Sequence, residues 1–138
     1  TPLGGDALMA FWFVENPAAA AAAHENDHGP GYHARYSLSS DRGATWTPAQ
    51  RITGESGVTE FVAAIGLGEN ERALVAWLDG RGRPHGPQRL YAQTFLADGP
   101  DRLVDASVCD CCPLAPARTK DAVLLAYRSS VASLPGSA

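Results

Sequence analysis

The sequence predicts an all-β protein, and three observations lead to this fold class. Short apolar segments alternate with turns along the 138-residue chain, which is rich in glycine (14 residues) and proline (10 residues). Such spacing is typical of antiparallel strands. A strongly patterned turn, Ser39 to Trp46, lies between two of these segments. One type of apolar strand also recurs along the chain, which indicates a repeated architecture.

The patterned turn reads Ser-x-Asp-x-Gly-x-Thr-Trp from Ser39 to Trp46. Asp41 can accept hydrogen bonds from backbone N–H groups of its own turn, and Gly43 can adopt a positive φ. The Ser39 hydroxyl can tie the two sides together, and Trp46 can cover the turn on its buried side. We therefore predict a hairpin corner with a buried, backbone-bonded Asp41. An ordinary Asp/Gly turn near a tryptophan is the alternative.

The recurring strand places an alanine before an aromatic residue. Ala10, Ala76 and Ala126 occupy this position and lie 66 and 50 residues apart. Propeller blades repeat every 40–50 residues or so. The first interval is lengthened by residues 17–31, which we interpret as a loop between two strands, with one helical turn as the alternative. The repeat favours a β-propeller over a sandwich.

In chain order, we expect three blade-like units, about 3–56, 57–108 and 109–138. The strands expected in the first unit are Leu8 to Glu15, Tyr32 to Ser39 and Ala49 to Thr53. Those of the second are Phe61 to Leu67, Arg72 to Leu78, Arg89 to Leu96 and Leu103 to Val108. Pro113 to Thr119 and Ala122 to Tyr127 begin the third. The chain is thus predicted to be a single partial propeller of about two and a half four-stranded blades.

Composition and charge exclude some classes of partner. The net charge is −4 and lysine and arginine form no run, so neither a nucleic acid nor an anionic membrane surface is an expected partner. No apolar run approaches the roughly 20 residues of a membrane span. No signal peptide is visible. Because the chain begins at Thr1, we expect a processed product or a fragment.

The strongest local signal for chemistry is the stretch Cys109-Asp110-Cys111-Cys112. Three thiols so close in sequence can offer several soft sulfur donors to one ion, as suits Cu(I), Zn or an Fe–S cluster. The spacing is not the Cys-x-x-Cys pair of zinc knuckles. The alternative is one disulfide with a spare thiol. A vicinal Cys111–Cys112 bridge would be strained, so Cys109 is the easier partner.

A second cluster contains His24, Asp27, His28 and His33. Histidine is the commonest metal ligand, and His24 and His28 would share one face if the segment were helical. On a loop this spacing guarantees no site, so a solvated polar loop is the alternative.

A third candidate follows Trp77, where Asp79 and Arg81 end an apolar strand. At the end of an inner propeller strand, these two side chains would line a polar ligand pocket. A turn held by an Asp79–Arg81 pair is the alternative. The remaining aromatic residues, which we assign to the core, are Phe11, Trp12, Phe13, Phe61 and Phe95.

Three features together resemble bacterial six-bladed propellers of the exo-sialidase-like, BNR-repeat family, whose repeated turn is called the Asp-box. They are the turn Ser39 to Trp46, the strand end Ala76 to Arg81, and the stretch Val108 to Pro113 leading to Tyr127-Arg128. The likeness covers most of Leu8 to Arg128. It implies structural roles for the Asp-box residues Ser39, Asp41, Gly43, Thr45 and Trp46.

The resemblance also implies a carbohydrate-active hydrolase and favours a periplasmic or secreted location. Sialidases clamp the substrate carboxylate with three arginines and use an Asp acid/base and a Tyr nucleophile activated by Glu. Their Arg-Ile-Pro signature is absent from this sequence. Relatives carry a further cysteine in a later blade, which this chain lacks. The ligand-binding candidates are Asp79, Arg81 and Arg128.

The leading functional hypothesis is therefore a sialidase-like propeller segment, a glycoside hydrolase without a visible complete catalytic set. The alternative is a non-enzymatic propeller that binds a ligand or a soft metal, Cu(I) or Zn, through Cys109, Cys111, Cys112 and nearby histidines. A scaffold without a small-molecule site is the third hypothesis. Carbohydrate is the expected partner, and we expect self-association or further blades to cover the open faces.

Overall fold

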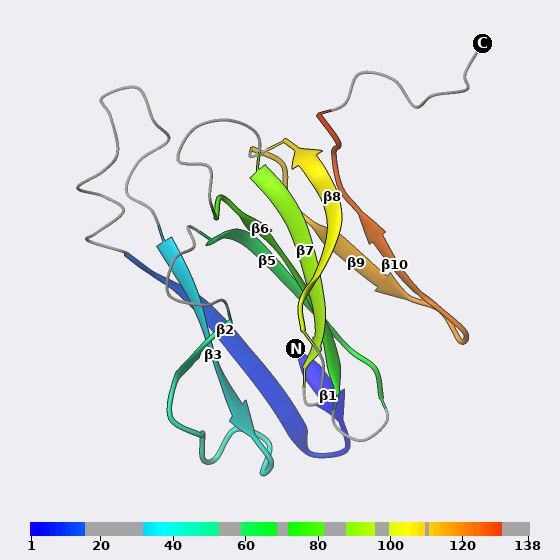
Figure 1. Ribbon diagram of the computed structural model, residues 1–138. Coiled ribbons are helices and arrows are strands. Elements are labelled where there is room, and N and C mark those ends of the chain that lie inside the picture. Colours follow the sequence, from blue (N-terminus) through cyan, green and yellow to red (C-terminus); the bar gives the residue numbers. More distant parts are fainter. Residues whose placement is uncertain are drawn as a thin grey trace.

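The computed structural model in Figure 1 describes residues 1–15, 32–52, 59–68, 72–81, 88–95, 100–109 and 111–130. Its regular structure in these ranges is entirely β and forms three antiparallel sheets. The all-β prediction is therefore confirmed. Within the described ranges, no helix has the length and apolar character needed to cross a membrane.

Each sheet is a simple meander in which the strands follow chain order. Sheet 1 contains β1 (Pro2–Gly4), β2 (Ala7–Glu15), β3 (Tyr32–Ser39) and β4 (Gln50–Arg51). Sheet 2 contains β5 (Thr59–Gly66), β6 (Ala73–Asp79), β7 (Gln88–Phe95) and β8 (Arg102–Val108). Sheet 3 contains β9 (Ala115–Arg118) and β10 (Val123–Ala126). The nine predicted strands are all present, with small differences at their ends.

Strand β1 was not predicted. Its three residues, Pro2, Leu3 and Gly4, include two that are typical of turns, and so short a segment shows no alternation. Its pairing with β2 nevertheless completes a four-stranded sheet, and Leu3 is buried in the core.

Sheet 2 lies between the other two sheets because both of its faces are apolar. Along β6, Val75 and Trp77 belong to the core shared with sheet 1, which also contains Met9 and Tyr36. Residues of opposite parity, such as Leu78, form a second core that contacts Leu125 of sheet 3. Side chains of a strand alternate between the two faces of its sheet, so one apolar strand supplies both cores.

The first strands of the three sheets lie close together, with β5 in contact with both β1 and β9. The backbone N–H of Gly68 donates to the Leu3 carbonyl at 3.2 Å. On the other side, the Arg118 guanidinium donates to the Gly66 carbonyl at 3.3 Å. A Cβ at Gly66 would overlap the carbonyl oxygen of Pro2 and lie 2.9 Å from the Cα of Leu3. Glycine is therefore required where β5 crosses β1.

Two of the five aromatic residues assigned to the core are not buried. Phe95 is buried, and Phe11 and Phe61 pack against the two cores. Trp12 and Phe13, by contrast, are 37% and 43% exposed. Trp12 has the opposite parity to Met9 and therefore points to the outer face of sheet 1. Phe13 contacts the half-exposed Tyr32 ring edge-to-face near the end of the β2–β3 pair.

Candidate functional site

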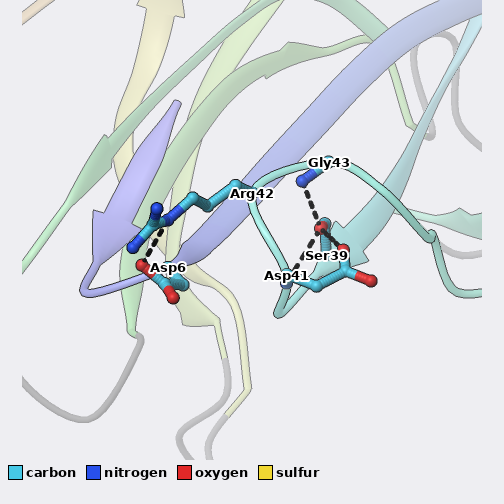
Figure 2. A network of polar contacts seen from close by, with 5 residues as sticks. All are labelled: Asp6, Ser39, Asp41, Arg42 and Gly43. Carbon is cyan, nitrogen blue, oxygen red and sulfur yellow. Dashed lines mark hydrogen bonds and ion pairs between the residues drawn. The ribbon is translucent and has the colours of Figure 1, made fainter.

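The patterned turn Ser39 to Trp46, called the Asp-box turn below after the motif it resembles, follows β3 and is organised around the Ser39 hydroxyl (Figure 2). This hydroxyl donates to the Asp41 carboxylate at 2.8 Å and accepts from the backbone N–H of Gly43 at 2.8 Å. It also lies 3.3 Å from the backbone nitrogen of Asp41. Gly43 has a φ of 91°, as expected, and Arg42 also has a positive φ of 59°. The backbone thus bends tightly around one small side chain.

Asp41 is bonded to the backbone as predicted, but it is exposed rather than buried. Its carboxylate accepts from the Thr45 backbone N–H at 2.8 Å and from the Thr45 hydroxyl at 2.6 Å. Hydrogen bonds from Thr45, first its hydroxyl and then its N–H, together with that from Ser39, lower the pKa of Asp41 to about 2. Because these bonds satisfy the charged carboxylate locally, it needs no burial beneath the sheet.

Trp46 is also more exposed than expected, at 44%. Its indole N–H donates to the Gly43 carbonyl at 3.0 Å, so the ring lies along the turn instead of being buried beneath it. A small pocket of about 250 Å³ adjoins the ring. Its lining residues are Leu3, Ala7, Leu38, Ser39, Ser40, Thr45, Trp46 and Thr47.

An ion pair that the sequence did not reveal fixes the Asp-box to the neighbouring β1–β2 turn. The Arg42 guanidinium donates to the Asp6 carboxylate at 2.8 Å (Figure 2). The Arg42 backbone N–H also donates to the Asp6 carbonyl at 3.0 Å. Arg42 occupies a variable position of the motif, and Asp6 is distant in sequence. The turn therefore has the contacts of a structural corner.

The three cysteines gather immediately after β8. The Sγ atoms of Cys109 and Cys111 lie 2.9 Å apart, those of Cys109 and Cys112 lie 3.4 Å apart, and those of Cys111 and Cys112 lie 3.9 Å apart. All three are free thiols; Cys111 is exposed and the other two are half-buried. Within the described part of the chain, they form the cluster of potential metal ligands.

The segment after β10 returns to β8 and closes the base of this loop. The Cys109 N–H donates to the Arg128 carbonyl at 2.9 Å, and the Ser130 N–H donates to the Ser107 carbonyl at 3.0 Å. Val108 and Ser129 form an antiparallel bridge between the two segments. The β9–β10 hairpin thus positions Arg128 beside the cysteines.

The contacts within the cysteine cluster shift the pKa values of Cys109 and Cys111 in opposite directions. Hydrogen bonds from the Cys111 thiol and then from the Cys111 backbone N–H lower the pKa of Cys109, and the charge of Arg128 adds to this effect. The pKa of Cys111 is raised to about 11, first because of its hydrogen bond to Cys109. The hydrogen bond with Cys112 and the nearby thiolate charges raise the pKa of Arg128. The cluster therefore favours a thiolate at Cys109, compensated by a guanidinium.

The Asp79–Arg81 candidate forms the turn pair that was its alternative interpretation. Asp79 is completely buried and accepts from the Arg81 backbone N–H and Nε, each at 2.7 Å. The indole N–H of Trp77 donates to the same carboxylate at 3.2 Å. Arg81 also binds Asp101 at 2.7 Å and lies 4.1 Å above the Tyr91 ring. This network joins the end of β6 to β7 and the start of β8.

The predicted site residues are therefore separated into distinct groups. Arg128 lies with Cys109, Cys111 and Cys112, whereas the Asp-box follows β3, which ends at the opposite end of the molecule from β8 (Figure 1). His33 is buried within β3, opposite Val14. His24 and His28 lie outside the described residues. No sequence motif could have revealed the contact between the thiols and Arg128, because the β9–β10 hairpin lies between them in the chain.

No protein-family model, curated protein or solved structure matches this chain. The family resemblance therefore stays a prediction.

Proposed function

We propose that this chain binds a soft metal ion, preferentially Cu(I), through the thiolates of Cys109, Cys111 and Cys112. The single observation that supports this proposal most is the convergence of three sulfur atoms within 3.9 Å of one another. Thiolates are the ligands that soft ions such as Cu(I) prefer.

The spacing of the sulfur atoms is compatible with trigonal coordination after a small expansion. A planar three-sulfur site with metal–sulfur bonds of about 2.3 Å separates its ligands by about 4.0 Å. The Cys111–Cys112 distance of 3.9 Å already meets this value, and the Cys109–Cys111 distance of 2.9 Å requires about 1 Å of opening. Zinc in structural sites takes four ligands, so a three-thiolate set suits Cu(I) better.

Arg128 supports the proposal electrostatically. Three thiolates and one Cu(I) carry two net negative charges, and a guanidinium beside Cys112 offsets part of them. In this proposal Arg128 does not bind the metal. It stabilises the deprotonated ligands from the neighbouring chain segment.

We further propose that the sheets are successive blades of a sialidase-like β-propeller. Three observations support this: the strands of each sheet follow chain order, successive sheets share apolar cores, and the first strands β1, β5 and β9 lie side by side. Four-stranded sheets arranged around an axis have these properties. The Asp-box contacts between β3 and β4 support the same family.

A glycoside hydrolase would need arginines that face a common pocket. In the described residues, Arg81 is engaged by Asp79 and Asp101, and Arg128 lies with the thiols. The metal site is therefore the function that the geometry supports best.

Anaerobic titration of the reduced protein with Cu(I) in the presence of a chromophoric chelator tests the proposal. We expect one equivalent to bind, with ultraviolet thiolate-to-copper absorption. Cys111→Ser should abolish competition with the chelator, and Arg128→Gln should weaken affinity by about tenfold, the usual effect of an outer-shell partner. Ser40→Ala, in the distant Asp-box, is the matched control. Failure of the reduced protein to bind copper, or full binding by Cys111→Ser, would contradict the proposal.

A further inference from the structure

We infer that Cys109 and Cys111 are a redox pair that closes reversibly to a disulfide by exchange with a small-molecule disulfide, and that this closure switches off the metal site. The redox half of this inference is independent of metal binding. The switching half rests on the proposed function of the three thiols.

The distances select this pair among the three possible ones. A disulfide bond measures about 2.05 Å, so the Cys109 and Cys111 sulfurs, at 2.9 Å, need to approach by about 0.9 Å. Cys112 lies farther from both, at 3.4 Å and 3.9 Å. A disulfide between Cys112 and Cys111 would join adjacent residues and be strained. A disulfide between Cys112 and Cys109 needs a larger approach of the two sulfur atoms than one between Cys109 and Cys111.

Access and anchoring also favour the same pair. Cys111 is exposed, so a small disulfide in solution can reach its sulfur. Cys109 is held by the hydrogen bond between its N–H and the Arg128 carbonyl, which ties its backbone to a paired segment. One partner is thus accessible and the other is fixed in position. This is the arrangement in which a mixed disulfide formed at one cysteine is resolved quickly by its neighbour.

The exchange balances as two successive displacements. A thiolate of the pair attacks one sulfur of the external disulfide, which forms a mixed disulfide and releases the first external thiolate. The second cysteine, as a thiolate, then attacks the protein sulfur of the mixed disulfide and releases the second external thiolate. The two leaving groups take up the two protons of the protein thiols. Two electrons pass from the cysteine pair to the external disulfide, which is reduced to two thiols.

Closure leaves one free thiol, Cys112. A disulfide sulfur is not a thiolate ligand, because only the thiolate is the metal-binding form. The oxidised protein therefore retains a single soft donor at the site and should release Cu(I). Bound Cu(I) should in turn protect the pair from exchange, since it occupies both sulfurs.

The redox half is tested on the full, metal-free chain incubated with oxidised glutathione and then analysed by mass spectrometry. We expect the wild type and Cys112→Ser to lose two hydrogens without a glutathione adduct, and peptide mapping of the wild type to join Cys109 to Cys111. Cys109→Ser should retain a glutathione adduct, because only the adjacent residues Cys111 and Cys112 remain and a disulfide between them would be strained. Cys111→Ser should close several-fold more slowly than Cys112→Ser.

Other results would overturn the inference. A disulfide to Cys112 in the wild type, or a persistent glutathione adduct on Cys112→Ser, would show that Cys109 and Cys111 are not the redox pair. Closure should also be several-fold faster in the native protein than in the urea-unfolded chain, and equal rates would show that the folded geometry does not promote it. This comparison uses the wild type alone and so does not depend on the folding of a variant.

The switching half is tested separately with Cu(I) and the same chelator. The oxidised protein should lose copper competition, and reduction with dithiothreitol should restore it. If the reduced protein binds no copper, the proposed function fails while the redox result stands. If the oxidised protein binds copper as tightly as the reduced one, the switch is refuted, and so is coordination by all three thiolates. If the reduced protein binds copper but Cys109 and Cys111 do not form a disulfide, the proposed function stands and the redox pair is refuted.

Discussion

Asp41 shows how a single residue of the Asp-box stabilises its turn without burial. The hydroxyl and N–H of Thr45, together with Ser39, donate to its carboxylate, and they stabilise the charged form. The pKa of Asp41 is accordingly lowered from 3.8 to about 2. A lowered pKa means that this contribution to stability is complete above about pH 4 and is lost as the pH falls toward 2.

We therefore predict that Asp41→Asn lowers the thermal midpoint of unfolding at pH 6 and that its difference from the wild type shrinks between pH 4 and pH 2. Thermal unfolding followed by circular dichroism over this pH range measures the effect. Ser40→Ala, at the exposed neighbouring position, serves as the control and should follow the wild type at every pH. A constant difference between Asp41→Asn and the wild type down to pH 2 would show that the charge of Asp41 does not stabilise the turn.

The sequence identified Arg128 as a candidate site residue, but it did not predict which residues lie beside Arg128. In the sequence it is a ligand-binding candidate, at the end of a stretch that carries the family resemblance. In the structure, its carbonyl accepts from Cys109 and its charge lies beside the thiols. This assignment depends on the return of the chain after β10.

Among the elements, the contact between β1 and β5 places the strictest demand on sequence. The backbone of β5 passes so close to Pro2 and Leu3 that Gly66 has no room for a side chain. The Thr1 hydroxyl also donates to the Ala64 carbonyl at 3.2 Å, which ties the same two strands together. Sheets 1 and 2 therefore meet backbone to backbone at this point.

We predict that Gly66→Ala destabilises the protein by about 3 kcal/mol, at the upper end of the usual cost of overpacking, because the added methyl group meets backbone atoms that cannot rotate away. Urea unfolding at neutral pH measures this loss. Gly5→Ala is the matched control: Gly5 has open space but a φ of 55°, so only backbone strain of about 1 kcal/mol is expected. A smaller loss for Gly66→Ala than for Gly5→Ala would contradict the close approach of β1 and β5.

For the whole molecule, the central observation is that β6, an inner strand of sheet 2, is covered on both faces, whereas apolar side chains of β8 and β10 remain exposed. Leu124 of β10 is 57% exposed, and Leu103 and Val104 of β8 are 52% and 49% exposed. Strand edges with apolar neighbours are open to pairing with another chain. A second copy of this chain would cover such surfaces.

We predict that this chain associates with itself in a concentration-dependent way. Size-exclusion chromatography with light scattering should show an average mass that rises with concentration. Leu124→Lys should reduce this association because it places a charge on the exposed face of β10, whereas Lys120→Arg, in the exposed turn before β10, should leave it unchanged. A monodisperse monomer at all concentrations would refute the prediction.

The sequence by itself determined every strand that the structure describes except β1. Alternating apolar residues between glycine and proline turns specify a strand locally, and the Asp-box specifies its turn through bonds among neighbouring residues such as Ser39, Asp41 and Thr45. The three cysteines are also neighbours in sequence, so their clustering required little from the fold. Only the tertiary structure decided that β1 joins sheet 1, that Asp41 stays exposed, that Asp79 pairs with Arg81 and Asp101, and that Arg128 lies beside the thiols. The physical reason is that local hydrogen bonds and side-chain alternation depend on adjacent residues, whereas burial and charge pairing depend on which distant strands are brought together.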